Sequence, residues 1–172
     1  MPKLLATSGA VVVLLTMGCG APPGNDAESA ASAARSVGAT RQGPVEVGQP
    51  TRDGGLEFVV TGVACGQQQI GLEPAVVARG EYCLVSIAVR NVGREPQLFS
   101  DASQRAYAGG TEFSPDVNAG LYANRDAAGF LNGMRAGESV TAEVVFDVPR
   151  GTRLTYLRLR ASGTSRGVLV VL

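Results

Sequence analysis

The most regular pattern of apolar and polar residues in the chain lies between Tyr82 and Asn91. One face of this stretch is entirely apolar and consists of Cys83, Val85, Ile87 and Val89. An alternation with a period of two is typical of a β-strand that packs one face against a core. The next residues, 91–96, have turn chemistry, because Gly93 can adopt a positive φ and Pro96 cannot donate a backbone hydrogen bond. The pattern therefore predicts a half-buried strand that ends in a turn.

Shorter apolar runs predict further strands. Besides 82–90, the expected strands are 56–65, 98–99, 104–108, 111–113, 140–148, 154–160 and 168–172. Gly109-Gly110 predicts a tight hairpin between two of them, and 168–172 is a continuous apolar run of the kind expected of a buried strand. Residues 67–79 are expected to be mostly loop. A single helical turn is expected further along the chain, at 126–130. Short strands at this spacing predict an all-β domain over residues 51–172, an antiparallel β-sandwich or barrel.

The first 19 residues predict export. Lys3 precedes an apolar run of about 14 residues, which is typical of a secretory signal and shorter than the ~20 residues that a membrane-spanning helix needs. The run ends at Gly18-Cys19, which resembles the bacterial lipoprotein signal, in which the cysteine takes lipid and becomes the mature N-terminus. Thr16 and Met17 depart from that signal. Cys19 is predicted to carry lipid, and an ordinary cleaved signal or a short uncleaved anchor are the alternatives.

Residues 20–50 predict a disordered tether. This segment is dominated by Ala, Gly, Ser and Pro and contains almost no large apolar side chains. Such a composition cannot bury enough surface to offset the entropy of ordering the chain. A flexible coil of ~30 residues would hold the folded domain on the order of 30 Å from the membrane.

The absence of histidine narrows the possible functions. The 172 residues include no His, which removes the commonest general base and the commonest zinc ligand. Basic and acidic residues number 15 each, so the net charge gives no reason to expect a nucleic-acid partner. The loop residues Asp101, Asp116, Asn118 and Asp126 could surround a calcium ion, but their spacing matches no known calcium loop. No catalytic residue, metal site or cofactor is predicted.

Two of the three cysteines are predicted to form a disulfide. If Cys19 takes lipid, Cys65 and Cys83 remain, and an exported chain favours their pairing. Each lies at a strand edge or on an apolar face, where a bridge between strands or sheets would be placed. A redox or metal role is the alternative, and the spacing and the missing histidine argue against it.

Several short motifs resemble one bacterial domain of unknown function. They are Cys65-Gly66, Gly80-Glu81-Tyr82-Cys83, Asn91-Val92-Gly93-Arg94-Glu95-Pro96, Ala136-Gly137-Glu138 and Phe146-Asp147-Val148-Pro149. This domain is common in actinobacterial lipoproteins and is related to the mycobacterial secreted immunoprotective antigen. The resemblance covers residues 45–172 and implies an immunoglobulin-like β-sandwich. The sequence departs from the family pattern at Ala136, where proline is usual. The resemblance implies no catalytic residues.

A run of arginines near the C-terminus is the most suggestive surface feature. Residues 148–172 contain five arginines and no acid, and the alternation places Arg158 and Arg160 on one strand face with Tyr156. This face could bind anionic lipid headgroups or an acidic partner. The alternative is a solvated outer face whose charge is balanced elsewhere in the chain.

The sequence thus predicts a non-catalytic binding module of the bacterial cell envelope. It would be held by lipid at the extracytoplasmic face of the membrane, or secreted, and would bind an unknown protein or envelope component. A carboxylate-dependent hydrolase and a purely structural envelope protein are the alternatives. A fold of this kind supports many functions, so the choice rests on the site.

Overall fold

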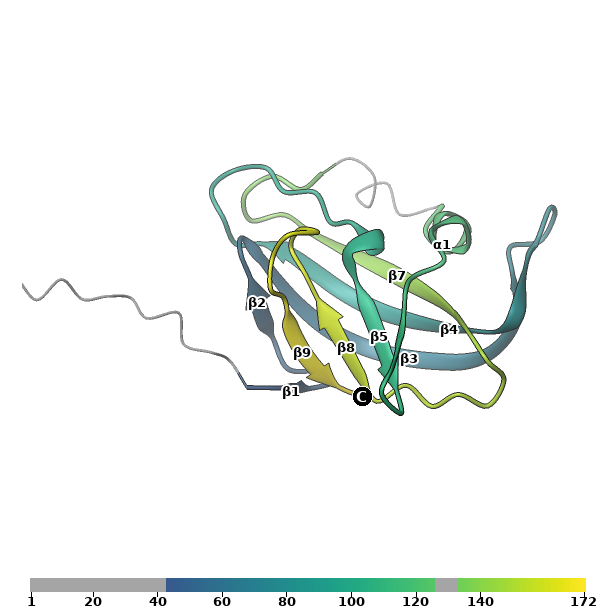
Figure 1. Cartoon of the computed structure of the whole chain (residues 1–172). Coiled ribbons are helices and arrows are strands. Elements are labelled where there is room, and N and C mark those ends of the chain that lie inside the picture. The colour runs from purple at the N-terminus through teal and green to yellow at the C-terminus, as the bar shows by residue number, and fades with distance from the viewer. Residues whose placement is uncertain (1–42, 126–132) are drawn as a thin grey trace, which may run out of the picture. The chain divides into compact units, whose positions relative to one another are not determined.

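The domain is a sandwich of two β-sheets (Figure 1). The computed structural model describes residues 43–125 and 133–172. The first sheet has the order β1-β9-β8-β5-β6 and consists of β1 (Val45–Glu46), β5 (Arg105–Ala108), β6 (Thr111–Phe113), β8 (Tyr156–Leu159) and β9 (Val168–Val171). The second has the order β2-β3-β4-β7 and consists of β2 (Thr51–Asp53), β3 (Leu56–Ile70), β4 (Val76–Asn91) and β7 (Ser139–Val148). The predicted β-sandwich is confirmed.

All strand pairs are antiparallel except β1 and β9, which run parallel. Val45 pairs with Val170, so the sandwich begins within residues 20–50, which the sequence assigned to the tether. A strand of two residues is too short to leave a periodic pattern, which is why the predicted start at residue 51 is late. The predicted leader, Cys19 and the tether up to residue 42 lie outside the described residues.

The core fills the space between the sheets. The predicted apolar face of β4 is confirmed, since Cys83, Val85, Ile87 and Val89 are fully buried. The rings of Phe58 and Phe99, from the second sheet and from the segment before β5, lie 6.2 Å apart and are tilted by 57°. Burying a large apolar side chain contributes about 1.5–3 kcal/mol. The apolar face of β4 therefore contributes four fully buried side chains to the core, which also includes residues of the first sheet.

The β3–β4 hairpin is longer than the sequence predicts. β3 continues to Ile70 and β4 begins at Val76, so residues 67–70 and 76–79 are strand and not loop. The pairing shifts register between Ala64 and Gln67 and again before Gln69. Such bulges break the period of two, which hides this part of the strand from pattern analysis.

Two other predicted strands differ in detail. Leu98–Phe99 is not a strand, and the 3₁₀ helix η1 (Asp101–Ser103) follows it. β9 is buried on one face only, because Val170 is fully buried while Leu169 and Val171 are partly exposed. The continuous apolar run of β9 therefore places hydrophobic side chains on an outer surface, and not only in the core.

A short helix, α1 (Val117–Ala123), covers part of the outer face of the second sheet (Figure 1). Its Ala119 packs in a small cluster with Tyr82 and Val145. Asp116 caps the helix by accepting a hydrogen bond from the Ala119 N–H at 3.0 Å. The sequence did not predict this helix, and its predicted helical turn at 126–130 lies outside the described residues.

Asn124, at the end of α1, pairs with the edge strand β7. Its amide nitrogen donates to the Glu143 carbonyl and its amide oxygen accepts from the Glu143 N–H, each at 2.7 Å. The side chain therefore satisfies backbone groups of β7 as another strand would, and it blocks this part of the sheet edge.

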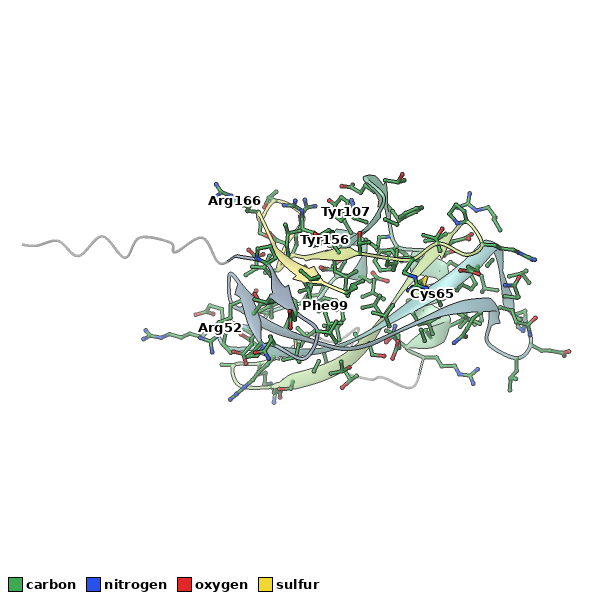
Figure 2. The ribbon with its side chains drawn as sticks, turned by 90° about the horizontal axis from the view of Figure 1, so that it is seen from below. Arg52, Cys65, Phe99, Tyr107, Tyr156 and Arg166 are labelled. Carbon is green, nitrogen blue, oxygen red and sulfur yellow. A yellow bond between two sulfur atoms is a disulfide. The ribbon has the colours of Figure 1, made fainter. Side chains whose placement is uncertain are left out.

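The disulfide between Cys65 and Cys83 is present (Figure 2). It joins the adjacent strands β3 and β4, with 4.0 Å between the two Cα atoms. Cys83 is fully buried on the core face, whereas Cys65 is exposed. The bridge lies beside the register shift of β3, so it holds the two strands together where their regular pairing is interrupted.

The motif residue Asn91 holds a turn. Its side chain is fully buried, and its amide donates to the carbonyls of Glu95 at 2.8 Å and Met134 at 2.9 Å. Its amide oxygen accepts from the Gly93 N–H at 2.9 Å. Asn91 therefore fastens the turn after β4 to the segment that leads into β7.

The motif residue Asp147 holds the other end of β4. Its carboxylate accepts hydrogen bonds from the backbone N–H groups of Arg79 at 3.0 Å and Gly80 at 3.1 Å. The exposed Arg79 guanidinium adds an ion pair at 3.1 Å. Burial raises the pKa of Asp147, but these hydrogen bonds and the arginine charge outweigh it and leave the pKa below its ordinary value.

We expect Asp147→Asn to remove an acid-sensitive part of the stability. Because the folded protein binds the Asp147 proton less tightly than the unfolded chain, this contribution is complete above the ordinary carboxyl pKa of about 4 and is lost as the pH falls below it. The variant should lose about 1–3 kcal/mol at pH 7. Urea unfolding at pH 7 and pH 3 should show a smaller difference between the two proteins at pH 3. An equal difference at both pH values would contradict this assignment.

Candidate binding face of the first sheet

The outer face of the first sheet carries tyrosines, arginines and aliphatic residues in register. Tyr107 of β5 lies directly opposite Tyr156 of β8, which lies opposite Val171 of β9. Two residues along each strand, Arg158 lies between Arg105 on one side and Leu169 on the other. The predicted residues Tyr156 and Arg158 therefore belong to a ladder that crosses three strands, and Figure 2 labels Tyr107 and Tyr156 on it.

The arginines of this ladder differ in their partners. Arg105 forms an ion pair with Glu112 at 3.3 Å, and the Tyr107 hydroxyl donates to the same carboxylate at 2.5 Å. Arg158 has no carboxylate partner among the described residues. Its guanidinium carbon lies 6.0 Å from the centre of the Tyr107 ring, and one terminal nitrogen donates to the Arg166 carbonyl at 3.3 Å. Arg158 therefore keeps its positive charge unpaired beside an aromatic ring.

A groove of about 620 Å³ runs along this face. Its walls come from β5, β8, β9 and the hairpin after β5, and they are formed by Tyr107, Gly109, Gly110, Thr155, Tyr156, Arg158, Leu169, Val171 and Leu172. Thr155 and Tyr156 are exposed there, and Tyr156 keeps 43% of its surface accessible. The volume lies within the range of about 300–1,000 Å³ that is usual for small-molecule sites.

Arg160, the third predicted residue, lies beyond the groove. Its backbone N–H donates to the Gln104 amide oxygen at 2.8 Å, and its carbonyl accepts from the Gln104 amide nitrogen at 3.0 Å. Gly167, with φ +73°, lets the stems of both arginines pass close to the backbone, because a Cβ there would lie 2.6 Å from Arg160 Cγ and 3.1 Å from Arg158 Cγ. The structure therefore brings Tyr156 and Arg158 together and holds Arg160 at the margin.

Tyr107, Leu169 and Val171 are groove residues that the sequence analysis missed. Tyr107 comes from a strand more than 40 positions away, and only the strand register shows that it faces Tyr156. Leu169 and Val171 were assigned to a buried strand. Residues 168–172 are all apolar, so no polar position marks which face of this strand is turned to solvent. The alternation of Arg105 and Tyr107 on β5 could have indicated the outer face of the sheet.

The acidic loop residues that the structure describes lie apart and have roles within the fold. Within 43–125 and 133–172 no group of three or more potential ligands gathers. Asp101 points into the fold, where burial raises its pKa, and a Cβ on Gly120 would lie 2.7 Å from its Oδ2. Asp116 caps α1, and Asp126 lies outside the described residues.

Asp116 also contacts a buried tyrosine. Burial, followed by the negative charges of Asp116 and Asp147, raises the pKa of Tyr82 to about 12. Its hydroxyl therefore remains protonated at neutral pH and donates to Asp116 Oδ2 at 3.4 Å. The two carboxylates nearest to this tyrosine both serve as hydrogen-bond acceptors for the fold.

The fold and the motifs define the class of protein as a small two-sheet β-sandwich domain. The sequence profile of the domain of unknown function DUF4352 matches residues 45–166, and the chain belongs to this family. The predicted resemblance is thereby confirmed, whereas an actinobacterial lipoprotein origin stays a prediction. Among curated proteins, none matches the chain significantly.

Solved structures show the same fold at low identity. The secreted protein MPT63 of Mycobacterium tuberculosis is similar with a TM-score of 0.57 and 16% identity, over 75% of this chain and 98% of that chain. The YjhA protein of Bacillus subtilis is similar with a TM-score of 0.55 and 13% identity, over 74% and 99%. At such identities the likeness supports the β-sandwich and no activity. No helix within the described residues is long and apolar enough to span a bilayer.

Proposed function

We propose that the protein is a non-catalytic binding module of the bacterial cell envelope that acts through the outer face of β5, β8 and β9. One observation carries the proposal: Arg158, which has no ion-pair partner in the described part of the chain, lines a groove of about 620 Å³ together with two tyrosines. An outer face that served only for solubility would be expected to pair its cations or to leave them fully solvated. Here the cation is half-buried and adjoins an apolar surface.

An extracytoplasmic location is supported by two features of the chain. Residues 1–19 have the pattern of an export signal, and the Cys65–Cys83 disulfide is of the kind that persists in oxidising compartments. MPT63, a protein of similar fold, is described as secreted. We infer that lipid on Cys19 anchors the module to the membrane surface, so that its groove meets components of the envelope.

The alternative of a carboxylate-dependent hydrolase finds little support in the described residues. A hydrolase of that kind needs two carboxylates that converge on a substrate site. Asp116 and Asp147, the two carboxylates that act on Tyr82, are occupied in capping α1 and in binding the β4 backbone. A purely structural role would not require the groove or the unpaired Arg158.

Lipid anchoring is tested by replacing Cys19. We expect Cys19→Ala to abolish lipid attachment, so that the intact mass no longer includes an acyl-glyceryl group and the protein no longer partitions into detergent with the membrane fraction. Globomycin, which blocks the lipoprotein signal peptidase, should leave the wild-type leader uncleaved. An unchanged mass and unchanged partitioning of the variant would refute the anchor.

Binding through the face is tested with a lipid-free polypeptide of residues 20–172, which lacks the predicted leader and Cys19 and includes the whole sandwich. We expect Arg158→Gln combined with Arg160→Gln to weaken cosedimentation with isolated envelopes at least tenfold, because a charge-assisted hydrogen bond is worth about 1.5–3 kcal/mol and 1.4 kcal/mol is tenfold in affinity. Arg94→Gln is the matched control, since Arg94 is an exposed arginine on the turn after β4. Equal binding by all three proteins would refute the proposal.

A further inference from the structure

We propose that the groove binds a single-chain anionic lipid, with the acyl chain along the groove and the carboxylate or phosphate head at Arg158. This inference rests on the proposed function and specifies its ligand class. The groove is amphipathic along its length. Arg158 and Leu169 lie at one end, the tyrosine pair lies in the middle, and the Gly109-Gly110 hairpin and Leu172 form the other end.

The middle and far end of the groove suit an apolar chain. The surface of the groove is mostly apolar, and its middle and far end are lined by Val171, Leu172 and the two tyrosines. Burial of apolar surface in such a groove is favourable at roughly 25 cal/mol per Å². The two glycines of the hairpin have no side chains to obstruct the path. The space beside each is open, because a Cβ built on either would meet nothing within 4 Å.

Two of the three hydroxyl groups in the groove are already hydrogen-bonded within the protein, which disfavours a polyhydroxylated ligand. The Thr155 hydroxyl donates to the Tyr107 carbonyl at 3.0 Å, and the Tyr107 hydroxyl donates to Glu112 at 2.5 Å. A sugar would need several free donors and acceptors to replace its bonds to water. The groove therefore offers one cation and an apolar surface, which are the two features that an anionic lipid requires.

The charge at the Arg158 end complements an anionic head. Arg160 and Arg166 lie close in the chain, and neither has an ion-pair partner among the described residues. Of the acids on this face, Glu112 is paired with Arg105, and Glu46 on the edge strand β1 lies opposite Val171, in the tyrosine row and away from Arg158. A guanidinium binds carboxylate and phosphate oxygens through paired hydrogen bonds, so either head fits this chemistry.

A discrete lipid is favoured over a bilayer surface because the face is concave. An open groove of about 620 Å³ is large enough to hold one chain along its floor, whereas a membrane surface would meet a flat or protruding patch. The aliphatic residues Leu169, Val171 and Leu172 line the groove and are only partly exposed. Bilayer binding is therefore one of the outcomes that the test must distinguish.

Decyl phosphate and decanoate, used below their micellar concentrations, are the probes. We expect both to bind the lipid-free residues 20–172 in a calorimetric titration, and to shift the NMR signals of Tyr107, Tyr156 and Val171. Decanol lacks the charge and inorganic phosphate lacks the chain, so each should bind at least tenfold more weakly. Arg158→Gln should weaken decyl phosphate about tenfold while leaving decanol unchanged, and Arg94→Gln should change neither.

The results separate this inference from the proposed function. If envelopes bind through Arg158 but the two probes do not bind, the ligand class is wrong and the binding module stands. If the probes bind at the tyrosines but replacing Arg158 does not weaken binding to envelopes, the proposed function is wrong while the lipid site stands. Equal affinity for decanol and decyl phosphate, or binding to anionic vesicles without binding to monomeric probes, overturns the lipid-head assignment.

Discussion

Replacing Gly80 by alanine is expected to destabilise the domain by about 3 kcal/mol or more, which is the upper range for overpacking. A Cβ on Gly80 would lie 2.1 Å from the Val148 carbonyl oxygen and 3.1 Å from the Pro149 Cα. Backbone atoms cannot rotate away as a side chain can, so β4 and β7 would have to separate. That separation would also break the hydrogen bond from the Gly80 N–H to Asp147.

Equilibrium unfolding in urea measures this effect, and Gly62→Ala provides the control. Gly62 also lies in a long strand of the second sheet, but the nearest atom to its Cβ would be Ser86 Oγ at 4.0 Å. We expect that variant to change the unfolding free energy by less than about 1 kcal/mol. Similar losses in the two variants would show that the Gly80 contact does not govern the packing of β4 against β7.

Removal of the disulfide should have a comparable effect. The bridge closes a loop with a sequence separation of 18, and the chain-entropy relation assigns about 3 kcal/mol to a loop of that length. A double variant should use Cys65→Ser at the exposed end and Cys83→Ala at the buried end, because a hydroxyl at position 83 would be buried in the core. The midpoint of urea unfolding should fall accordingly.

A reductant supplies the internal check on that prediction. Wild-type protein that is reduced should approach the stability of the double variant, and the double variant should not respond to reductant. If the reduced wild type unfolds at the same urea concentration as the oxidised protein, the bridge contributes nothing measurable to stability. In that case the bulged pairing of β3 and β4 would hold by itself.

The sequence predicts the long strands because burial on one face leaves a period of two. The apolar faces of β7 and of residues 82–91 of β4 follow this rule and lie where the alternation placed them, whereas the earlier part of β4 was predicted as loop. The period of two does not reveal elements that are interrupted or very short. β3 is bulged, β1 has two residues, and α1 spans only seven residues, so none of them sustains a period long enough to detect.

The family motifs prove to be parts of the scaffold. Asn91 fastens the turn after β4, Asp147 holds the backbone at Arg79 and Gly80, and Cys83 closes the bridge to β3. None of these residues lines the groove of the first sheet. The motifs therefore identify the fold and explain why the resemblance carries no binding residues.

The candidate site was only half predictable. Tyr156 and Arg158 follow each other on one strand face, so alternation alone could pair them. Tyr107, Leu169 and Val171 join them through the registers of β5 and β9, which depend on the closure of the whole sheet. That Arg158 has no carboxylate partner among the described residues is likewise a property of the fold, in which Glu112 of β6 pairs with Arg105 of the intervening strand β5.

Site-specific photo-crosslinking in intact cells tests the binding face most directly. A photoreactive residue at Tyr156, on the outer face of the first sheet, is compared with one at Thr141, an exposed position on β7 of the second sheet. We expect an envelope component to become attached at position 156 and not at position 141, and intact-mass spectrometry of the adduct identifies whether it is a lipid. No adduct at position 156, or the same adducts at both positions, would contradict the assignment of this face.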